Sequence, residues 1–352
     1  MARTATAQMI RVLGVVVALM GLLAPSPLQA APQKSTSSKT ATRPPAPAAK
    51  KAYNAAAARA RRARVARARA AARAREAREA QTPRFKTDES GQQVPDVRAA
   101  AAIIYNPVTR EVLWESNAED ERSIASITKV MTALVVLESG MDLTEPVKVV
   151  RSDVARASTT YLRLGYTVTG EDLLNLLLVG SDNAAARALA RVSPYGSAGF
   201  IDRMNEKAEE LGLTTTHYAD PSGLLADNVS SAYDMAQLIA YASADERIGS
   251  IMRKTSYTTS AGKRVITANA TNQLVKTGDI DVLGGKTGFI SRAGYCLATL
   301  LRLPETGQQV AVVVLGAKSN ASRFWETRHL FNWLSTRTRA LVTNEDGQPQ
   351  QD

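Results

Sequence analysis

The chain has 352 residues, of which 45% are hydrophobic, and it carries 44 Lys and Arg against 33 Asp and Glu, a formal net charge of +11. This length holds one large or two ordinary domains, and a single cysteine excludes an internal disulfide framework. The charge is uneven, because residues 1–30 carry +2, residues 31–87 carry +14 and residues 88–352 carry −5. The basic character therefore belongs to an N-terminal segment.

Residues 1–30 have the order of a secretory signal peptide. Arg3 and Arg11 precede the apolar run 12–24, and a Pro-Ser-Pro break and small residues follow. The apolar run is short for a bilayer span, so we expect export to the periplasm, with an uncleaved N-terminal anchor as the alternative.

Residues 31–94 are predicted to form a basic linker, disordered or helical. Residues 31–51 are mostly Ser, Thr, Pro, Ala and Lys, and residues 55–80 are almost wholly Ala and Arg. Ala and Arg favour helix, but no larger apolar stripe is present to pack, so any helix here is solvated. The segment is either a soluble spacer or an attachment to an anionic envelope surface. Nucleic acid would suit the charge, but export argues against it.

Residues 95–340 are predicted to form one catalytic domain, followed by a flexible tail at 341–352. Residues 99–105 and 111–115 predict two strands joined by a turn. A helix then begins near 123–126 and ends before Gly140. Its apolar residues recur at helical spacing, which predicts one buried face: Ile127, Val130, Met131, Leu134 and Val135.

The start of this helix carries Ser126 and Lys129, three positions apart. Residues at this spacing share a helix face, and a desolvated lysine can remove the proton from a hydroxyl. Ser126 is therefore a candidate nucleophile. The spacing alone is weak, because a second S-x-x-K occurs at Ser260 and Lys263, where the sequence predicts a hairpin turn.

Ser181, Asp182 and Asn183 lie between two predicted helices, 171–179 and 184–192. These short polar residues bring hydroxyl, carboxylate and amide groups to the edge of the core. The simpler interpretation is an N-cap for the second helix, where Ser and Asp are preferred.

The remaining elements predict an α+β fold. We expect an antiparallel sheet shared by the first and last strands, flanked by helices, with a mostly helical second lobe. Helices are predicted at 198–212, 231–243 and 324–334, and strands at 255–259, 264–267, 283–290, 294–303 and 309–315.

K-T-G also occurs twice. Lys276–Gly278 runs into Asp279 and predicts a loop, whereas Lys286–Gly288 follows two glycines and precedes Phe289 within a predicted strand. Glycines in a strand permit close approach to its backbone, so the second copy is the candidate for the site.

Ser126-x-x-Lys129, Ser181-Asp182-Asn183 and Lys286-Thr287-Gly288 together resemble, in chain order, the motifs of the penicillin-binding proteins and serine β-lactamases. Residues 220–224, 231–235 and 286–297 are further similar to the low-molecular-mass D-alanyl-D-alanine peptidases, and most similar to the endopeptidases among them. The resemblance implies cleavage of peptidoglycan stem peptides through a serine acyl-enzyme, with cross-link endopeptidase activity preferred over terminal carboxypeptidase activity. It also implies β-lactams as covalent inhibitors.

The resemblance further implies residue roles. Ser126 would be the nucleophile, Lys129 its base and Ser181 a proton relay to the leaving amine. The backbone N–H groups of Ser126 and Phe289 would form the oxyanion hole. The implied substrate-binding residues are Asn183, Lys286, Thr287 and Arg323. Asn183 would bind a substrate amide or fix Lys129. For Arg323, an ordinary surface arginine is the alternative.

Two alternatives remain, a serine β-lactamase and a non-catalytic penicillin-recognising envelope binder. No E-x-x-L-N segment lies between Asn183 and Asp220, which disfavours the β-lactamase. Phe289 stands where relatives carry Thr, Ser or His. His217 and His329 share no motif, so neither a metal nor a cofactor is expected, and Cys296, inside an apolar run, is expected to be a buried hydrophobe.

Overall fold

The computed structural model describes residues 48–345, and the chain divides into two parts at residue 62. Helix α1 (Ala48–Gln81) crosses this boundary, and every side chain described in it is exposed. The predicted signal peptide and residues 346–352 of the predicted tail lie outside the described residues. None of the helices described here combines the length and the apolar composition needed to cross a bilayer.

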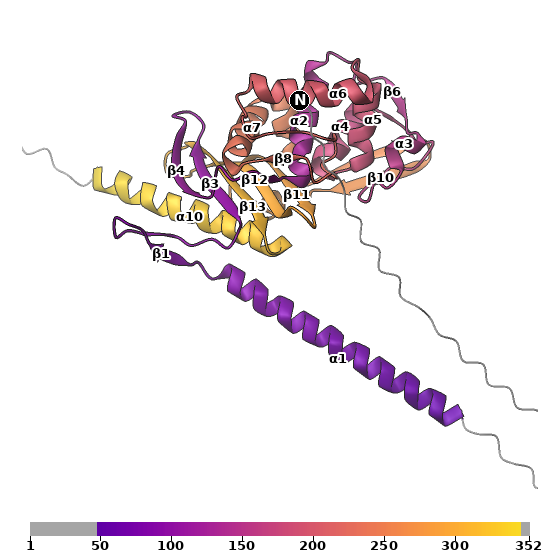
Figure 1. Ribbon diagram of the computed structural model, residues 1–352, viewed down its shortest axis with the longest axis horizontal. Coiled ribbons are helices and arrows are strands. Elements are labelled where there is room, and N and C mark those ends of the chain that lie inside the picture. Colours follow the sequence, from indigo (N-terminus) through magenta and orange to yellow (C-terminus); the bar gives the residue numbers. More distant parts are fainter. Residues whose placement is uncertain (1–47, 346–352) are drawn as a thin grey trace, which may run out of the picture. The chain divides into compact units, whose positions relative to one another are not determined.

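A five-stranded antiparallel sheet is the centre of the second part, in the order β11-β12-β13-β3-β4 (Figure 1). The first and last strands of the domain share it, as the sequence predicts, and β11 is an edge strand. The strands are β3 (Ala101–Asn106), β4 (Glu111–Ser116), β11 (Val282–Ile290), β12 (Gly294–Arg302) and β13 (Gln309–Ala317).

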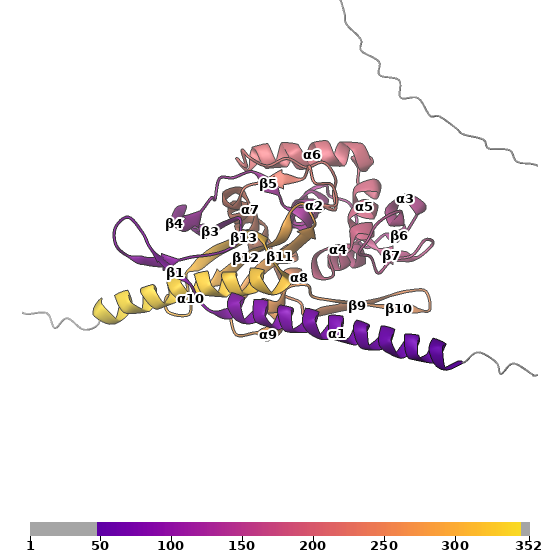
Figure 2. The ribbon, with the colours of Figure 1, turned by 60° about the horizontal axis from the view of Figure 1, so that its bottom comes forward.

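The two faces of the sheet are covered by different helices. Alternate residues of a strand point to opposite faces, so Ile103 joins the core beneath α7 (Ala232–Ala244), and Ile104 joins the core beneath α10 (Asn320–Glu345). Figure 2 shows α10 along one face of the sheet and α2, α6 and α7 beyond the opposite face.

Helix α2 (Lys129–Glu138) lies at the centre of the helical lobe. Residues 129–136 are all buried, so the prediction of one buried face is wrong, because helices surround α2. Its neighbours include α4 (Gly170–Val179), α5 (Asn183–Val192), α6 (Gly196–Glu210) and α7, and α8 (Glu246–Met252) packs against α4 and α7.

Short elements complete the domain. They are β5 (Arg122–Ser123) with β8 (Val229–Ser230), β6 (Pro146–Lys148) with β7 (Thr167–Thr169), β9 (Ser256–Ala261) with β10 (Arg264–Asn269), α3 (Arg151–Val154) and α9 (Gln273–Thr277). The second S-x-x-K lies at the β9–β10 hairpin turn, as predicted. The loop predicted around Lys276 is instead the end of α9, capped by Gly278 in the left-handed region.

The folded part begins before the predicted boundary at residue 95. Strands β1 (Phe85–Thr87) and β2 (Gln93–Pro95) pair inside the segment predicted as linker. Contacts with α10 hold them: the His329 ring lies 2.7 Å from the Arg84 carbonyl oxygen, and Trp333 Nε1 donates to the Gln93 carbonyl at 3.3 Å. Such distant partners leave no local sequence pattern. Likewise, α10 continues to Glu345, past the predicted start of the tail at 341.

Candidate active site

Ser126 lies in a 3₁₀ turn, η1 (Ala125–Thr128), which runs directly into α2 at Lys129. Side chains three apart eclipse one another in a 3₁₀ helix, which brings them closer than an α-helix would. Lys129 Nζ lies 2.9 Å from Ser126 Oγ. The predicted pairing of hydroxyl and amine is therefore present, although a tighter turn than expected produces it.

Lys129 is fully buried, and its amine has three partners. Asn183 Oδ1, at 2.6 Å, and the Ser222 carbonyl oxygen can only accept hydrogen bonds, whereas Ser126 Oγ can donate one. A neutral amine has two N–H groups and one lone pair, so it can donate to the first two and accept from Ser126, whereas an ammonium donates to all three. The partner set therefore accommodates the lysine both before and after it takes a proton, as a general base requires.

Burial also favours the neutral amine. Desolvation lowers the pKa of Lys129 to about 7, against the opposing effect of the Asp220 and Asp182 carboxylates. A base with a pKa near neutrality is half deprotonated at physiological pH and still accepts a proton readily.

Asn183 is fixed in one orientation. Its Nδ2 donates to the Ala157 carbonyl oxygen at 2.7 Å, which leaves Oδ1 directed at Lys129. Of the two roles implied for Asn183, this geometry favours fixing Lys129. Asp182 caps α5 by accepting from the Ala185 N–H at 2.9 Å, as the N-cap interpretation predicts.

A second hydroxyl–amine pair joins the other two motifs. Lys286 Nζ, on β11, donates to Ser181 Oγ at 2.8 Å and to the Thr287 carbonyl oxygen at 3.0 Å. Desolvation, reinforced by the charges of Lys129 and Arg323, lowers the pKa of the buried Lys286 well below its usual value. The structure thus brings residues from three distant motifs together.

The turn 220–223 belongs to the site, although sequence reasoning gave it no role. Its Ser222 carbonyl accepts from Lys129, and the Asp220 carboxylate holds the turn by accepting from the backbone N–H groups of Ser222 at 2.5 Å and Gly223 at 2.7 Å. The sequence Asp-Pro-Ser-Gly predicts a turn. Which backbone carbonyl of the turn contacts the lysine cannot be predicted from residue types, because every residue has a carbonyl.

Backbone strain is concentrated around the site. Ala125, directly before Ser126, has φ +48°, and Ser158 and Ser181, which line the cleft, have φ +59° and +58°. Each left-handed non-glycine residue costs roughly 1–3 kcal/mol and persists only where its surroundings enforce it.

A cleft of about 410 Å³ lies over these groups, a volume within the usual range for ligand pockets. Ser126, Ser181 and Thr287 line it, and Thr287 Oγ1 donates to Thr271 Oγ1 at 2.6 Å. Phe289 lines it with a side chain that is 49% exposed and stacks on Tyr295 at 4.2 Å between ring centroids.

Arg323 also lines the cleft, but it is only 6% exposed, so the alternative of a surface arginine is wrong. Its Nη1 donates to the carbonyl oxygens of Gly288 at 2.9 Å and Cys296 at 3.2 Å. The guanidinium therefore braces β11 and β12. Cys296 is itself fully buried, and burial raises the pKa of its thiol to about 11.

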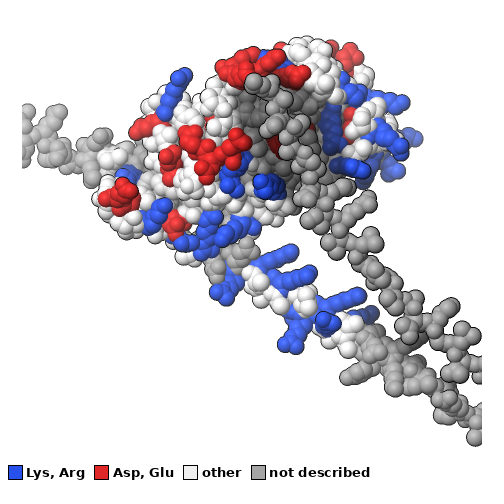
Figure 3. All heavy atoms as spheres, viewed as in Figure 1, with Lys and Arg blue, Asp and Glu red and all other residues white. Residues whose placement is uncertain are grey.

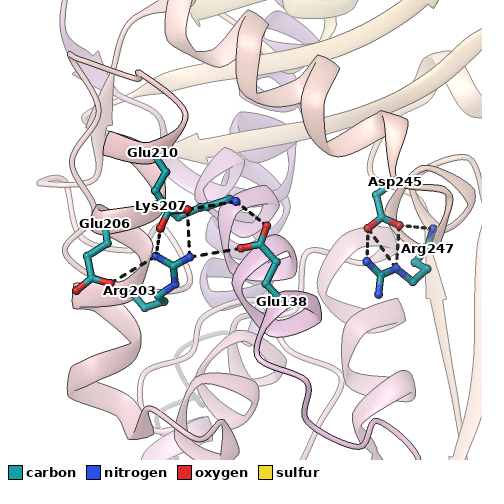
Figure 4. A network of polar contacts seen from close by, with 7 residues as sticks. All are labelled: Glu138, Arg203, Glu206, Lys207, Glu210, Asp245 and Arg247. Atoms are coloured by element: carbon teal, nitrogen blue, oxygen red, sulfur yellow. Dashed lines mark hydrogen bonds and ion pairs between the residues drawn. The ribbon is translucent and has the colours of Figure 1, made fainter.

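The far end of α2 is anchored by charges. Glu138 forms ion pairs with Lys207 at 2.7 Å and with Arg203 at 3.6 Å, both on α6, and Glu210 joins the same network (Figure 4). With Lys129 bonded at its start, α2 is fixed at both ends.

This fold and site define the class of DD-peptidases and penicillin-binding proteins. The crystal structure of the Streptomyces K15 DD-transpeptidase superposes with a TM-score of 0.63 at 28% identity, covering 68% of this chain and 97% of that one. Penicillin-binding protein D2 of Listeria monocytogenes, solved with cefotaxime bound, gives 0.60 at 31% identity, covering 68% and 98%.

The chain belongs to the D-alanyl-D-alanine carboxypeptidase family, peptidase S11, whose sequence profile matches residues 88–319. It is 34% identical to a D-alanyl-D-alanine endopeptidase of Escherichia coli, over 69% of this chain and 79% of that protein. It is 33% identical to the enzyme of the same name from Pseudomonas aeruginosa, over 68% and 78%. The protein is therefore a D-alanyl-D-alanine peptidase, a hydrolase.

We expect the acylation rate to follow the neutral form of Lys129. With a pKa of about 7, the neutral fraction rises from about one-tenth at pH 6 to about nine-tenths at pH 8. Acylation by a fluorescent penicillin should rise through this range and level off above it, and Lys129→Arg should abolish it. Lys263→Arg is the matched control. A rate that falls or stays flat between pH 6 and 8 would contradict the assignment of Lys129 as base.

Gly223→Ala should disrupt the nucleophile turn. Gly223 has φ +76°, and a Cβ there would lie 2.0 Å from the Ala125 carbonyl oxygen, so the 3₁₀ turn must move. Gly262→Ala is the control, because Gly262 has φ +60° with no atom within 4 Å of its Cβ position. Both variants have a left-handed backbone penalty of about 1 kcal/mol. Only Gly223→Ala should also lose at least tenfold in penicillin acylation rate, and equal rates for the two would refute the packing argument.

Proposed function

We propose that the protein is an exported D-alanyl-D-alanine endopeptidase that cleaves peptidoglycan cross-links through an acyl-enzyme on Ser126. The contact of Ser126 Oγ with the buried Lys129 amine, 2.9 Å away and with a pKa lowered to about 7, carries this proposal. Ser126 Oγ attacks the carbonyl carbon between two D-amino acids while its proton passes to Lys129 Nζ. The backbone N–H groups of Ser126 and Phe289 stabilise the oxyanion.

The second pair serves the leaving group. When the C–N bond breaks, Ser181 Oγ relays to the departing amine the proton that Lys129 took from Ser126, and Lys286, which lies 2.8 Å from Ser181 Oγ, holds this hydroxyl in place. Water then attacks the acyl-enzyme, and the proton that it loses to Lys129 passes on to Ser126 Oγ as the ester bond breaks. Arg323 provides the positive charge, and the Lys286 amine and the Thr287 hydroxyl provide polar contacts, for a substrate carboxylate at this end of the cleft, and Asn183 keeps Lys129 in place.

The preference for cross-links rests on three relatives, each named D-alanyl-D-alanine endopeptidase and 33–34% identical. Relatives named carboxypeptidase are 29–31% identical. Because this substrate lies outside the cytoplasmic membrane, the signal-like residues 1–30 agree with export to the periplasm.

Incubation with purified cross-linked muropeptides tests the activity. Wild-type protein should convert dimers to monomers, and fluorescent penicillin should label it. Ser126→Ala should lose both, because no nucleophile remains, whereas Ser260→Ala, in the second S-x-x-K, should keep both.

The other outcomes separate the alternatives. Trimming of pentapeptides with dimers left intact would restrict the activity to carboxypeptidase. Rapid turnover of nitrocefin would indicate a β-lactamase. Penicillin labelling without any hydrolysis of peptides would indicate a non-catalytic binder.

We also propose that the basic helix α1 attaches the enzyme to an anionic envelope surface. Lys and Arg side chains gather along α1 (Figure 3), and the arginines described there are exposed. Each basic residue near an anionic membrane contributes about 1 kcal/mol of attraction, which salt screens.

Co-sedimentation with vesicles tests this attachment. Exchange of Arg59, Arg61, Arg62, Arg64 and Arg67 for Gln should weaken binding to phosphatidylglycerol vesicles at least tenfold, because five charges are lost. Exchange of the same residues for Lys keeps the charge and is the matched control. Equal binding of the Gln variant, or equal binding to neutral vesicles, would favour the soluble spacer.

A further inference from the structure

A second pocket, of about 480 Å³, adjoins the catalytic cleft, and Phe289 and Ser291 line both. Three cations line this basic pocket, namely Arg122, Arg292 and Lys318. They come from separate segments, β5, the β11–β12 turn and the residue after β13. No acidic side chain is among the described residues that line it.

The charge of the basic pocket is not compensated by ion pairs. Within residues 48–345, none of its three cations forms a salt bridge, although acids outnumber bases 31 to 26 in residues 88–352. Burial raises the pKa of Glu326, and the charge of Lys318 opposes this effect. The Glu326 carboxylate already accepts a hydrogen bond from the Ala99 N–H at 2.8 Å. A positive pocket in a mildly acidic domain attracts anionic ligands.

Arg122 is held in place and has an unused donor. Gly316 has φ +72° and no side chain, so the Arg122 guanidinium packs directly against its backbone. A Cβ at this position would lie 3.3 Å from Arg122 Nη2 and 3.5 Å from its Nε. Its Nε is buried and has no hydrogen-bond partner. Because this Nε has no accessible surface, Arg122 would act on a carboxylate in the pocket through the charge of its guanidinium rather than through this donor.

The position of the basic pocket relates it to the substrate path. β11 is an edge strand, so an extended peptide can pair along its open side. At Gly288 this strand passes against the nucleophile, since a Cβ there would lie 3.2 Å from Ser126 N. Phe289 and Ser291 continue from there into the basic pocket.

We propose that the basic pocket is a subsite for a free carboxylate of the stem peptide, on a residue a few positions from the bond that Ser126 attacks. This inference rests on the proposed peptidase function and adds a requirement on its substrate. Peptides with that carboxylate are bound through Arg122, Arg292 and Lys318, and peptides whose carboxylate is amidated lose this contact.

Two cross-linked peptides that differ only in amidation of this carboxylate provide the test. Wild-type protein should cleave the free acid with a kcat/KM about tenfold higher, mainly through KM, and added salt should reduce the difference. In R292Q/K318Q, where both exposed side chains lose their charge, the two peptides should differ by less than about twofold. K263Q/R264Q, at the β9–β10 turn, removes the same charge elsewhere and should keep the preference.

Penicillin labelling distinguishes failure of the proposed subsite from failure of the proposed peptidase function. It should be retained by R292Q/K318Q, which shows that the catalytic centre is folded. Absence of labelling in the wild type would refute the proposed function itself. Normal labelling with no preference for the free acid, or with the preference intact in R292Q/K318Q, would overturn the subsite alone.

Discussion

The site depends on one buried amine that must be uncharged before it can accept the proton of Ser126. Lys129 Nζ is out of contact with water and has two acceptors and one hydroxyl around it. Loss of either acceptor would leave an N–H unpaired in the core, a penalty of about 1–3 kcal/mol. Each partner comes from a different element, η1, α5 and the turn 220–223, so the amine also ties these elements together.

The surrounding architecture keeps this arrangement tight. α2 is buried along residues 129–136 and fixed at its far end by Glu138, so Lys129 has little freedom to move. Glycines at 223 and 288 let two backbone segments approach the nucleophile turn more closely than any side chain would permit. The strained residue Ala125 is held between these contacts.

Much of the fold follows from patterns that are local in the sequence. Short apolar runs bounded by turn residues predict the strands of the sheet, and the motifs Ser126-x-x-Lys129 and Lys286-Thr287-Gly288 lie on the predicted elements. What could not be predicted depends on distant partners. The hairpin β1–β2 is held by α10, the Ser222 carbonyl acts through its position alone, and the 3₁₀ turn at Ser126 has the same sequence pattern as an α-helix.

The state of the only cysteine bears on the compartment in which the enzyme is proposed to work. Cys296 lies within β12 with no exposed surface, and the raised pKa of its thiol keeps the reactive thiolate scarce. Oxidants therefore meet neither an accessible sulfur nor a second thiol in the same chain with which to form a bridge. Folding of this chain therefore requires no internal disulfide, and the folded domain shields its thiol from the oxidants of its surroundings.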